Sequence, residues 1–324
     1  MRVGIDVSPL AQTRAGTARY LRALLARNEY VQLGLPGTSR LATVMRDALW
    51  YPLALPREAR KHNLDVLHCP TFRAPFFSTP MPLVVTVLDL AVLRHPGMFN
   101  QWSRRYSRFA VPRVVQAADA VITISEFTRS EVVGLLGAPP EKVHAIPIAV
   151  EAPFTAEGRR AEGDYVLAVG TLEPRKNLAR VVEAARRLGA ELRVVGARGW
   201  GGVSAGGAGV TALGEVPDEE LAALYRGAQA VAYPSLYEGF GLPVLEAMAC
   251  GAPVVTSRGG ATEELAGDAA LLVDPLDPAA IAAGLEEAIR RREELQLKGL
   301  ARALSFSWDR VARETWAVYE QVAA

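Results

Sequence analysis

Short apolar runs alternate with amphipathic helical patterns along the whole chain, and this alternation constrains the fold most strongly. The runs typical of buried strands are residues 2–7, 66–69, 83–87, 120–124, 165–170, 192–196, 230–234, 253–257 and 270–273. Apolar strands bounded by turns are typical of parallel sheets, and helices between such strands give βαβ units. The sequence therefore predicts an α/β protein with doubly wound parallel sheets.

A polar stretch divides this alternation into two halves. Residues 151–164 read EAPFTAEGRRAEGD, lack apolar periodicity and are followed by a new strand and helix. The length of 324 residues also suits two domains. We predict two Rossmann-like domains, 1–151 and 152–306, and a final helix over 307–324. The cleft between two such domains is the expected ligand site.

The composition favours a soluble, cytoplasmic protein. Half of the residues are hydrophobic, which suffices for a sizeable core. The two cysteines, Cys69 and Cys250, are too few for a disulfide framework and suit a reducing compartment. The N-terminus MRVGIDVS is too short and polar for a signal peptide, and Asp89 breaks the apolar run LVVTVLDLAVL. Peripheral contact with the inner membrane face is left open.

The charge is uneven along the chain. The first 150 residues hold 18 Lys and Arg against 10 Asp and Glu, whereas the rest hold 18 against 25. This asymmetry suggests two units with different partners, and solvated surface charge is the alternative. The basic helical stretch 100–116 also carries aromatic residues, so it could hold an anionic acceptor, touch lipid headgroups or simply form a solvated face. We expect no nucleic-acid partner.

Several common cofactor motifs are missing from the sequence. It contains no G-x-G-x-x-G, no G-x-x-x-x-G-K-[ST] and no Asp-x-Asp pair, which argues against a dinucleotide dehydrogenase or a P-loop enzyme. The four histidines are scattered and do not form a metal-binding cluster with the cysteines. We therefore expect neither a cofactor nor a metal.

The stretch YEGFGLPVLEAMACGAPVV, residues 237–255, combines two carboxylates with flexible backbone. It forms a loop after the strand at 230–234 and then a helix that starts after Gly241. Gly239 and Gly241 let the backbone approach a ligand, and the helix N-terminus suits an anion such as phosphate. Glu238 and Glu246 would accept hydrogen bonds from sugar or ribose hydroxyls. The alternative for Glu246 is a solvated helix face.

A second stretch, VGTLEPRKNL at residues 169–178, opens the second half with a strand, a loop and a helix. Arg175 and Lys176 lie in the loop or the first helical turn, where cations are poorly placed for the helix dipole. A binding role explains this placement, because two cations and a helix N-terminus can hold a diphosphate. A solvated Arg–Lys pair is the alternative.

The residues PSLYEGFGLPVLEAMACGAPVVTS, followed by EELAGDAALLVDPLDP, resemble the retaining glycosyltransferases of family four. This resemblance implies the two-domain GT-B fold and its Glu-x7-Glu motif. It implies that Glu238 contacts hydroxyls of the transferred sugar and that Glu246 contacts the nucleotide ribose. It also implies that a group of backbone atoms faces the sugar and the diphosphate, namely those of Gly239, Phe240, Gly241 and Leu242.

Other stretches share this resemblance. The stretch 169–178, with Gly170, Arg175 and Lys176, resembles the family's donor-diphosphate site. GEVPDEELAALY resembles a segment that closes over the base near Val216. QTRAGTARYLRALL resembles the N-terminal glycine loop, although Gly16 lacks the family's second glycine two residues later. The Gly-rich residues 196–210 are expected to form a mobile loop and not a phosphate cradle.

The first half departs from the family at one position. The family has His-Asp after the strand at 83–87, and that histidine orients the transferred sugar, whereas here Leu88 precedes Asp89. Leucine can neither donate nor accept a proton. Either Asp89 and a nearby group suffice, or catalysis is weakened, or the arrangement differs. His95 is a candidate substitute or an ordinary loop histidine. Ser125, an expected helix N-cap, and Arg129 are weaker site candidates.

The resemblance implies a metal-independent hexosyltransferase that retains anomeric configuration. It also implies that the first domain binds the acceptor, that the second binds the sugar nucleotide, and that the final helix crosses back to the first domain. The expected catalytic residues are Glu238, Arg175, Lys176 and Asp89. The donor is a nucleotide-diphosphate sugar, for which GDP-mannose and UDP-glucose both fit, and the acceptor is a glycan or lipid-linked hydroxyl. Two alternatives are open, namely a sugar-nucleotide-binding protein with degraded catalysis and another Rossmann-type enzyme such as a nucleotide-sugar epimerase.

Overall fold

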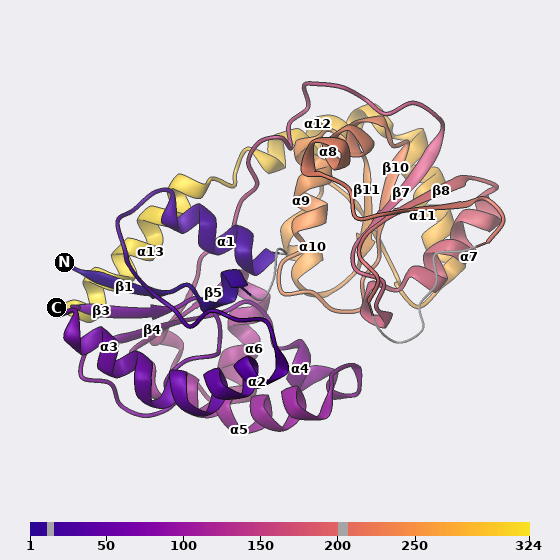
Figure 1. Ribbon diagram of the computed structural model, residues 1–324. Helices are drawn as coiled ribbons and strands as arrows, with labels where there is room; N and C mark the ends of the chain where they lie inside the picture. The colour runs from indigo at the N-terminus through magenta and orange to yellow at the C-terminus, as the bar shows by residue number, and fades with distance from the viewer. Residues whose placement is uncertain (12–15, 200–206) are drawn as a thin grey trace. The chain divides into compact units, whose positions relative to one another are not determined.

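The chain folds into two compact units (Figure 1). The computed structural model describes residues 1–11, 16–199 and 207–324. The first unit consists of Met1–Ile148 together with Trp308–Ala324, and the second consists of Ala149–Ser307. Residues 151–164 contain no helix or strand and belong to the second unit. Arg226 fixes them there by donating hydrogen bonds to the carbonyl oxygens of Thr155 and Arg159.

The described residues of the first unit contain a six-stranded sheet in which every pairing is parallel. In sheet order its strands are β2 (Val31–Leu33), β1 (Val3–Asp6), β3 (Val66–Cys69), β4 (Leu83–Val87), β5 (Ala120–Thr123) and β6 (Val143–Ala145). The four central strands are fully buried, as the apolar runs in the sequence predict. The three-residue edge strands β2 and β6 were not predicted.

Helices connect these strands. They are α1 (Gly16–Leu25), α2 (Arg40–Met45), the π-helical segment η2 (Arg46–Ala54), α3 (Leu55–Lys61), α4 (Ala91–Arg94), α5 (Gln101–Ala117), α6 (Glu126–Leu136) and α13 (Trp308–Ala323), with short 3₁₀ turns at Ser8–Ala11, Pro96–Met98 and Pro140–Lys142. The Ser125 hydroxyl accepts a hydrogen bond from the Thr128 N–H, which confirms Ser125 as the N-cap of α6.

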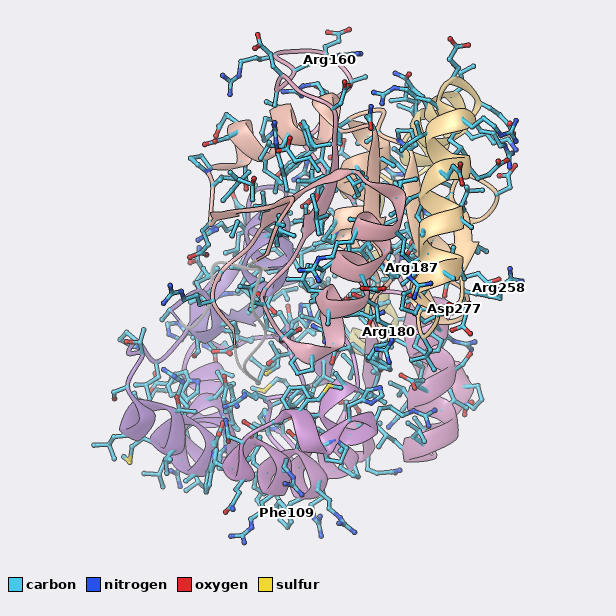
Figure 2. All side chains as sticks on the ribbon, turned by 90° about the vertical axis from the view of Figure 1, so that its right-hand side faces the viewer. Phe109, Arg160, Arg180, Arg187, Arg258 and Asp277 are labelled. Atoms are coloured by element: carbon cyan, nitrogen blue, oxygen red, sulfur yellow. The ribbon has the colours of Figure 1, made fainter. Side chains whose placement is uncertain are left out.

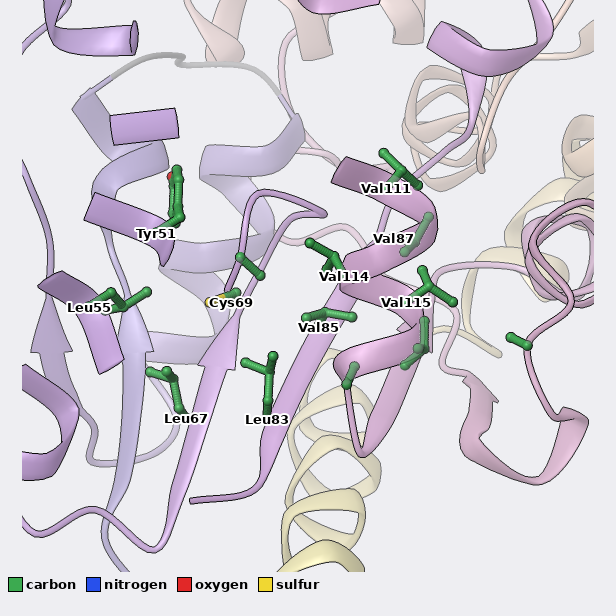
Figure 3. Close-up of a cluster of buried hydrophobic side chains, with 14 of the residues drawn as sticks. Tyr51, Leu55, Leu67, Cys69, Leu83, Val85, Val87, Val111, Val114 and Val115 are labelled. Atoms are coloured by element: carbon green, nitrogen blue, oxygen red, sulfur yellow. The ribbon is translucent and has the colours of Figure 1, made fainter. Parts of the chain in front are cut away.

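The helices η2, α3 and α5 pack on one face of this sheet (Figure 3). Leu83, Val85 and Val87 of β4 point into this core. Because side chains alternate along a strand, Thr86 points to the opposite face. There its hydroxyl lies 3.1 Å from the Tyr20 hydroxyl of α1 and 2.8 Å from His68 Nε2.

The final helix α13 belongs to this opposite face. The hydroxyl of Tyr319 in α13 lies 2.7 Å from His68 Nδ1 of β3. Burial lowers the pKa of His68 to about 3, so this imidazole is neutral near pH 7. Each ring nitrogen of His68 therefore has a hydroxyl partner, and the buried network joins α13 to the sheet.

The described part of the second unit contains another six-stranded parallel sheet. In sheet order its strands are β12 (Leu271–Val273), β11 (Val254–Ser257), β10 (Ala230–Tyr233), β7 (Tyr165–Val169), β8 (Glu191–Val195) and β9 (Val210–Gly214). The edge strand β9 has no buried residue and was not predicted. Of the predicted mobile loop 196–210, residues 200–206 lie outside the described residues.

The helices of the second unit are η5 (Pro174–Lys176, a 3₁₀ turn), α7 (Leu178–Leu188), α8 (Asp218–Gly227), α9 (Leu242–Ala249), α10 (Gly260–Ala266), α11 (Pro278–Arg290) and α12 (Arg292–Ala303). Together, the two sheets confirm the predicted pair of Rossmann-like folds. Cys69 and Cys250 are both buried free thiols. Among the helices in the described part of the chain, none is both long and apolar enough to cross a bilayer.

Candidate active site

Two loops meet at one edge of the second sheet. Strand β10 pairs with β7 in parallel, so the loops that follow both strands leave from the same edge. The Leu236 N–H donates a hydrogen bond of 2.9 Å to the Arg175 carbonyl oxygen. The Asn177 side chain donates to the carbonyl oxygen of Pro234 at 2.9 Å. These contacts hold the Arg175–Lys176 turn against the loop that carries Glu238.

Glu238 lies at the centre of a polar cluster. Its Oε2 accepts a hydrogen bond from Arg175 Nη1 at 2.8 Å, and its Oε1 accepts from Lys176 Nζ at 2.7 Å. The Tyr233 hydroxyl donates to Oε1 at 2.9 Å and itself accepts from Lys176 Nζ at 2.6 Å. The structure therefore brings together three of the four predicted catalytic residues.

The electrostatics of the cluster keep Glu238 ionised. Burial alone would raise its pKa, but the charges of Lys176 and Arg175 outweigh burial and lower the pKa to about 2. Burial raises the pKa of Tyr233 well above its usual value, so that phenol keeps its proton and acts as a donor. A carboxylate with so low a pKa stays ionised at neutral pH, so it can only accept hydrogen bonds and is a weak base.

The two cations are more tightly paired than the sequence suggests. Arg175 Nη2 lies 2.6 Å from Oε1 of Glu173, which is almost fully buried. Arg175 thus contacts Glu173 and Glu238, and Lys176 contacts Glu238, so two acidic side chains face the two basic ones. The alternative of a solvated Arg–Lys pair is therefore wrong, because both side chains are over four-fifths buried and salt-bridged.

Glu246 lies inside the second unit and not on a solvated helix face, so that alternative is also wrong. Only 2% of it is exposed, and its Oε2 accepts a hydrogen bond of 3.0 Å from the Tyr225 hydroxyl. Burial and the Glu246 carboxylate both raise the pKa of Tyr225 well above its usual value. The ribose contact stays a prediction.

The glycine loop before α9 is constrained by close packing. Gly241 is the N-cap of α9 with φ of 102°, and an added Cβ would lie 2.9 Å from Thr262 Cγ2. Phe240 is buried, with its ring 5.9 Å from the Phe306 ring. Pro243 has no N–H, and the Val244 N–H bonds to the Gly241 carbonyl oxygen. This N-terminus thus offers fewer free N–H donors than the sequence pattern predicts.

The remaining donor-site candidates of the second unit follow strands β7, β9 and β10 in the chain. Gly170 follows β7 with φ of 143°, and an added Cβ would lie 3.2 Å from Lys176 Cδ, so the glycine leaves room for the lysine stem. Gly239 is buried, and Leu242 and Val216 are half-buried. Val216 lies between β9 and α8, one residue before the N-cap Pro217.

The candidates of the first unit gather around a separate cavity. A cavity of about 340 Å³ is lined by Pro9, Thr17, Thr71, Phe72, Arg73, Leu88 and Asp89. Asp89 Oδ1 accepts a hydrogen bond of 2.9 Å from the Ala91 N–H and so helps to start α4. Gly16, the first residue of α1, directly precedes Thr17 in the cavity wall. Arg73 also lines the cavity, paired with Asp47, and was not predicted as a site residue.

Three weaker candidates have structural contacts. His95 ends α4 and is not among the described residues that line the cavity. Ser125 is buried and bonded to Thr128, as its N-cap role requires. Arg129 donates hydrogen bonds to the carbonyl oxygens of Val143 at 2.7 Å and Pro140 at 3.0 Å, which joins α6 to the start of β6.

Sequence reasoning missed three polar residues with specific partners. Tyr233 and Glu173 belong to the Glu238 cluster, and each lies within five residues of a predicted site residue. Asp6 is the last residue of β1 and a buried carboxylate, and burial raises its pKa to about 6 despite hydrogen bonds from Ser8, Trp50 and Tyr51. Their signal was their position at the carboxyl end of a parallel strand. In the described residues, no group of three or more His, Cys, Asp or Glu side chains is placed to hold a metal ion.

Both halves of the chain match known glycosyltransferase families. Residues 2–152 match the family described as "Glycosyltransferase Family 4", and residues 151–298 match "Glycosyl transferases group 1". O-antigen chain mannosyltransferase B of Escherichia coli is 33% identical over 282 residues, which cover 77% of this chain and 74% of that protein. The MMP alpha-(1->4)-mannosyltransferase of Mycolicibacterium hassiacum is 32% identical over 65% of this chain and 56% of its own length.

A solved structure shows the same fold. HepE of Anabaena, in complex with UDP and glucose, superposes with a TM-score of 0.75 over 99% of both chains, at 17% sequence identity. This similarity agrees with the two parallel sheets described above. With the two family matches and the relative that is 33% identical, the chain belongs to the GT-B glycosyltransferases of family four and group 1.

Proposed function

We propose that the protein transfers a hexose from a nucleotide-diphosphate sugar to a hydroxyl of a glycan or lipid-linked acceptor, with retention of anomeric configuration and without a metal. The observation that carries this proposal is the Glu238 cluster. The ionised carboxylate of Glu238 accepts hydrogen bonds from Arg175 and Lys176 at the edge of the sheet where the parallel strands end. Such an edge is where a sugar diphosphate binds in α/β folds.

The leaving diphosphate sets the main demand on the site, because its negative charge grows as the glycosidic bond breaks. Lys176 has three N–H donors, and two of them bond to Tyr233 and Glu238. The third donor, the guanidinium of Arg175 and the dipole of α9 would stabilise the developing charge. Because these groups supply positive charge from the protein itself, the proposal does not need a divalent cation.

Glu238 would hold the sugar and would not act as the base. Its pKa of about 2 makes it a poor base, and as an ionised carboxylate it has further lone pairs that can accept hydrogen bonds from sugar hydroxyls. We propose that the proton of the attacking hydroxyl passes to a phosphate oxygen of the leaving diphosphate, on the same face of the sugar. The bond from C1 to the diphosphate oxygen breaks, the bond from C1 to the acceptor oxygen forms, and the configuration is retained.

The acceptor would bind in the first unit. The cavity is lined by Asp89 and by Arg73, whose guanidinium also pairs with Asp47, so it can bind hydroxyls of an acceptor. Because the Leu88 side chain forms no hydrogen bonds, Asp89 or another residue would have to orient the transferred sugar. Two relatives named as mannosyltransferases support mannose as the sugar, and the structure of HepE with UDP and glucose keeps glucose in consideration.

Two other functions have less support. The relatives named as mannosyltransferases favour transfer over epimerisation. A binding protein with degraded catalysis rests on Leu88 alone, and the intact Glu238 cluster argues against it.

Slow donor hydrolysis tests the proposal without knowledge of the acceptor. GDP-mannose and UDP-glucose are incubated separately with the protein in EDTA, and proton NMR follows the anomeric signal of the released sugar before mutarotation. Release of the α-anomer supports a retaining, metal-independent transferase. Initial release of the β-anomer contradicts retention, and activity that appears only when Mg²⁺ or Mn²⁺ is restored contradicts metal independence.

A further inference from the structure

The exposed side of α2 and η2 is apolar, which is unusual for a helix on a protein surface. Leu41, Val44, Met45, Leu49 and Leu53 recur at near-helical spacing, and each is at least 37% exposed. The opposite side of η2 is buried and includes Arg46, Asp47, Trp50 and Tyr51. Surface helices normally place polar residues outward. The exposed apolar stripe therefore indicates that another surface binds to this side of α2 and η2.

Helix α5 continues this surface. Its outward positions include Trp102 and Phe109, which are 44% and 49% exposed. Trp102 Nε1 donates a hydrogen bond of 3.0 Å to Asp47 Oδ2, so α5 and η2 lie side by side over the same core. Phe109 points away from the sheet of the first unit (Figure 2). The other outward positions of α5 include four arginines, namely Arg104, Arg105, Arg108 and Arg113.

We call this surface the apolar–basic face. It consists of Leu41, Val44, Met45, Leu49, Leu53, Trp102, Phe109 and the four arginines of α5. In residues 40–54 and 101–117, all of them described, the only acidic residue is Asp47, and it is buried against Arg73. The face thus presents positive charge beside apolar side chains.

Helices of the second unit show how an ordinary solvated surface of this chain looks. Along α11 and α12 and their end residues, Arg290 pairs with Glu287, and Arg291 pairs with Glu294. Exposed leucines of this segment are single residues, such as Leu297 within α12 and Leu304 just after it. The apolar–basic face differs in both respects, because its arginines stand without acidic neighbours on their helix and its apolar residues form a stripe.

A cavity is lined by residues of α4 and by three of the four arginines of α5. It measures about 480 Å³ and is lined by Arg104, Arg105 and Arg108 of α5, together with Val92 and Leu93 of α4 and nearby residues. Three guanidinium groups beside apolar side chains suit a phosphate that is attached to a hydrocarbon. A lipid headgroup has this chemistry.

We propose that the apolar–basic face docks on the surface of a membrane that contains anionic lipids. The apolar stripe and the two aromatic side chains enter the interface, and the arginines meet the headgroup phosphates. A second copy of the chain is a poorer occupant, because a symmetric contact would bring the same arginines together. This proposal goes beyond the proposed glycosyl transfer and does not depend on it.

Sedimentation with lipid vesicles tests the proposal on the full chain. Vesicles of phosphatidylcholine, with and without phosphatidylglycerol, are mixed with wild type and spun. We expect binding only when phosphatidylglycerol is present, and weaker binding as salt rises. The double variant Leu49→Gln/Leu53→Gln should bind at least about tenfold more weakly. The double variant Arg105→Gln/Arg108→Gln should lose about fivefold for each arginine.

Matched controls carry the same substitutions in the second unit. Leu297→Gln/Leu304→Gln and Arg187→Gln/Arg290→Gln make the same chemical changes at exposed positions and should bind as wild type does. Thermal unfolding checks that all variants fold. Absence of wild-type binding, or equal losses in the test and control pairs, overturns the proposal. A dimer in light scattering that Leu49→Gln/Leu53→Gln dissociates would instead assign the face to a second copy.

Discussion

The Nζ atom of Lys176 lies 2.7 Å from Oε1 of Glu238, and both side chains are largely buried. The lysine therefore sets the charge of the carboxylate, and the carboxylate limits how strongly the lysine attracts an anion. A donor that brings both sugar hydroxyls and a diphosphate can engage both groups at once. We therefore expect loss of the Glu238 charge to strengthen the binding of free nucleotide diphosphates and to slow the reaction of the complete sugar nucleotide.

Glu238→Gln should separate sugar recognition from diphosphate binding. The amide keeps the shape of the side chain but removes a negative charge beside Arg175 and Lys176. We expect transfer or donor hydrolysis to fall about a hundredfold. The affinity for free GDP or UDP should rise roughly fivefold or more, because one like charge is removed near the phosphate. Calorimetry and a hydrolysis assay measure the two effects, and unchanged hydrolysis would remove Glu238 from the site.

Lys176→Met should weaken the binding of nucleotide diphosphates. A charged hydrogen bond to phosphate contributes about 1.5–3 kcal/mol, so the affinity should fall by roughly tenfold to a hundredfold. Lys298→Met is the matched control, because Lys298 belongs to the same unit but is paired with Asp268 and Glu294 at the surface. Equal affinities of the two variants in a nucleotide titration would contradict the assigned role of Lys176.

Gly241→Ala should destabilise the loop before α9. The backbone has φ of 102°, and the added Cβ would lie 2.9 Å from Thr262 Cγ2. We expect a loss of about 1–3 kcal/mol in the free energy of unfolding. Gly134→Ala is the control, because Gly134 lies inside α6 with nothing within 4 Å of an added Cβ. That change should raise the free energy of unfolding by about 0.5–1 kcal/mol in denaturant titrations, because alanine is more stable than glycine inside a helix. The same sign for both variants would refute the argument.

Acid should weaken the first unit through His68. Its pKa is about 3 in the folded chain and 6.5 as the reference value, so the unfolded state binds the proton more tightly. Stability should therefore fall as the pH drops from 6.5 toward 3, by at most about 1.4 kcal/mol for each pH unit. Asp6 acts in the opposite direction between pH 6 and 3.8, because its pKa is raised.

A variant isolates the contribution of His68. His68→Gln removes the titrating group, so the acid-dependent loss of stability should become smaller than in wild type. His62→Gln, at an exposed position of the same unit, should keep the wild-type slope. Denaturant unfolding between pH 4 and pH 7 supplies the comparison. If the pH dependence of stability is the same in His68→Gln as in wild type, the protonation of His68 does not contribute to the loss of stability in acid.

The sequence predicts the central strands well because their apolar runs are continuous, as in β4, where all five residues are buried. It does not predict β2, β6 and β9, because edge strands are short or lack buried residues. Their pairing depends on neighbours that are distant in sequence, such as Leu192 opposite Val210. Periodicity within one segment cannot supply that information.

The same limit applies to the site. The glycine loop and the helix after Gly241 were predicted from local spacing, since turn and helix signals are local. The pairing of Arg175 with Glu173 was not, although the two residues are neighbours, because side-chain direction decides it. The burial of Glu246 depends on Tyr225 in another helix. The apolar stripe of α2 and η2 was not predicted from the sequence.

Calorimetric titration of wild type with GDP-mannose, UDP-glucose, GDP and UDP in EDTA would show whether the second unit holds a donor site. We expect that one base series binds without metal and that its sugar nucleotide binds at least as tightly as its free diphosphate. No binding across the panel, in a protein shown to be folded, would contradict a donor site at Arg175, Lys176 and Glu238.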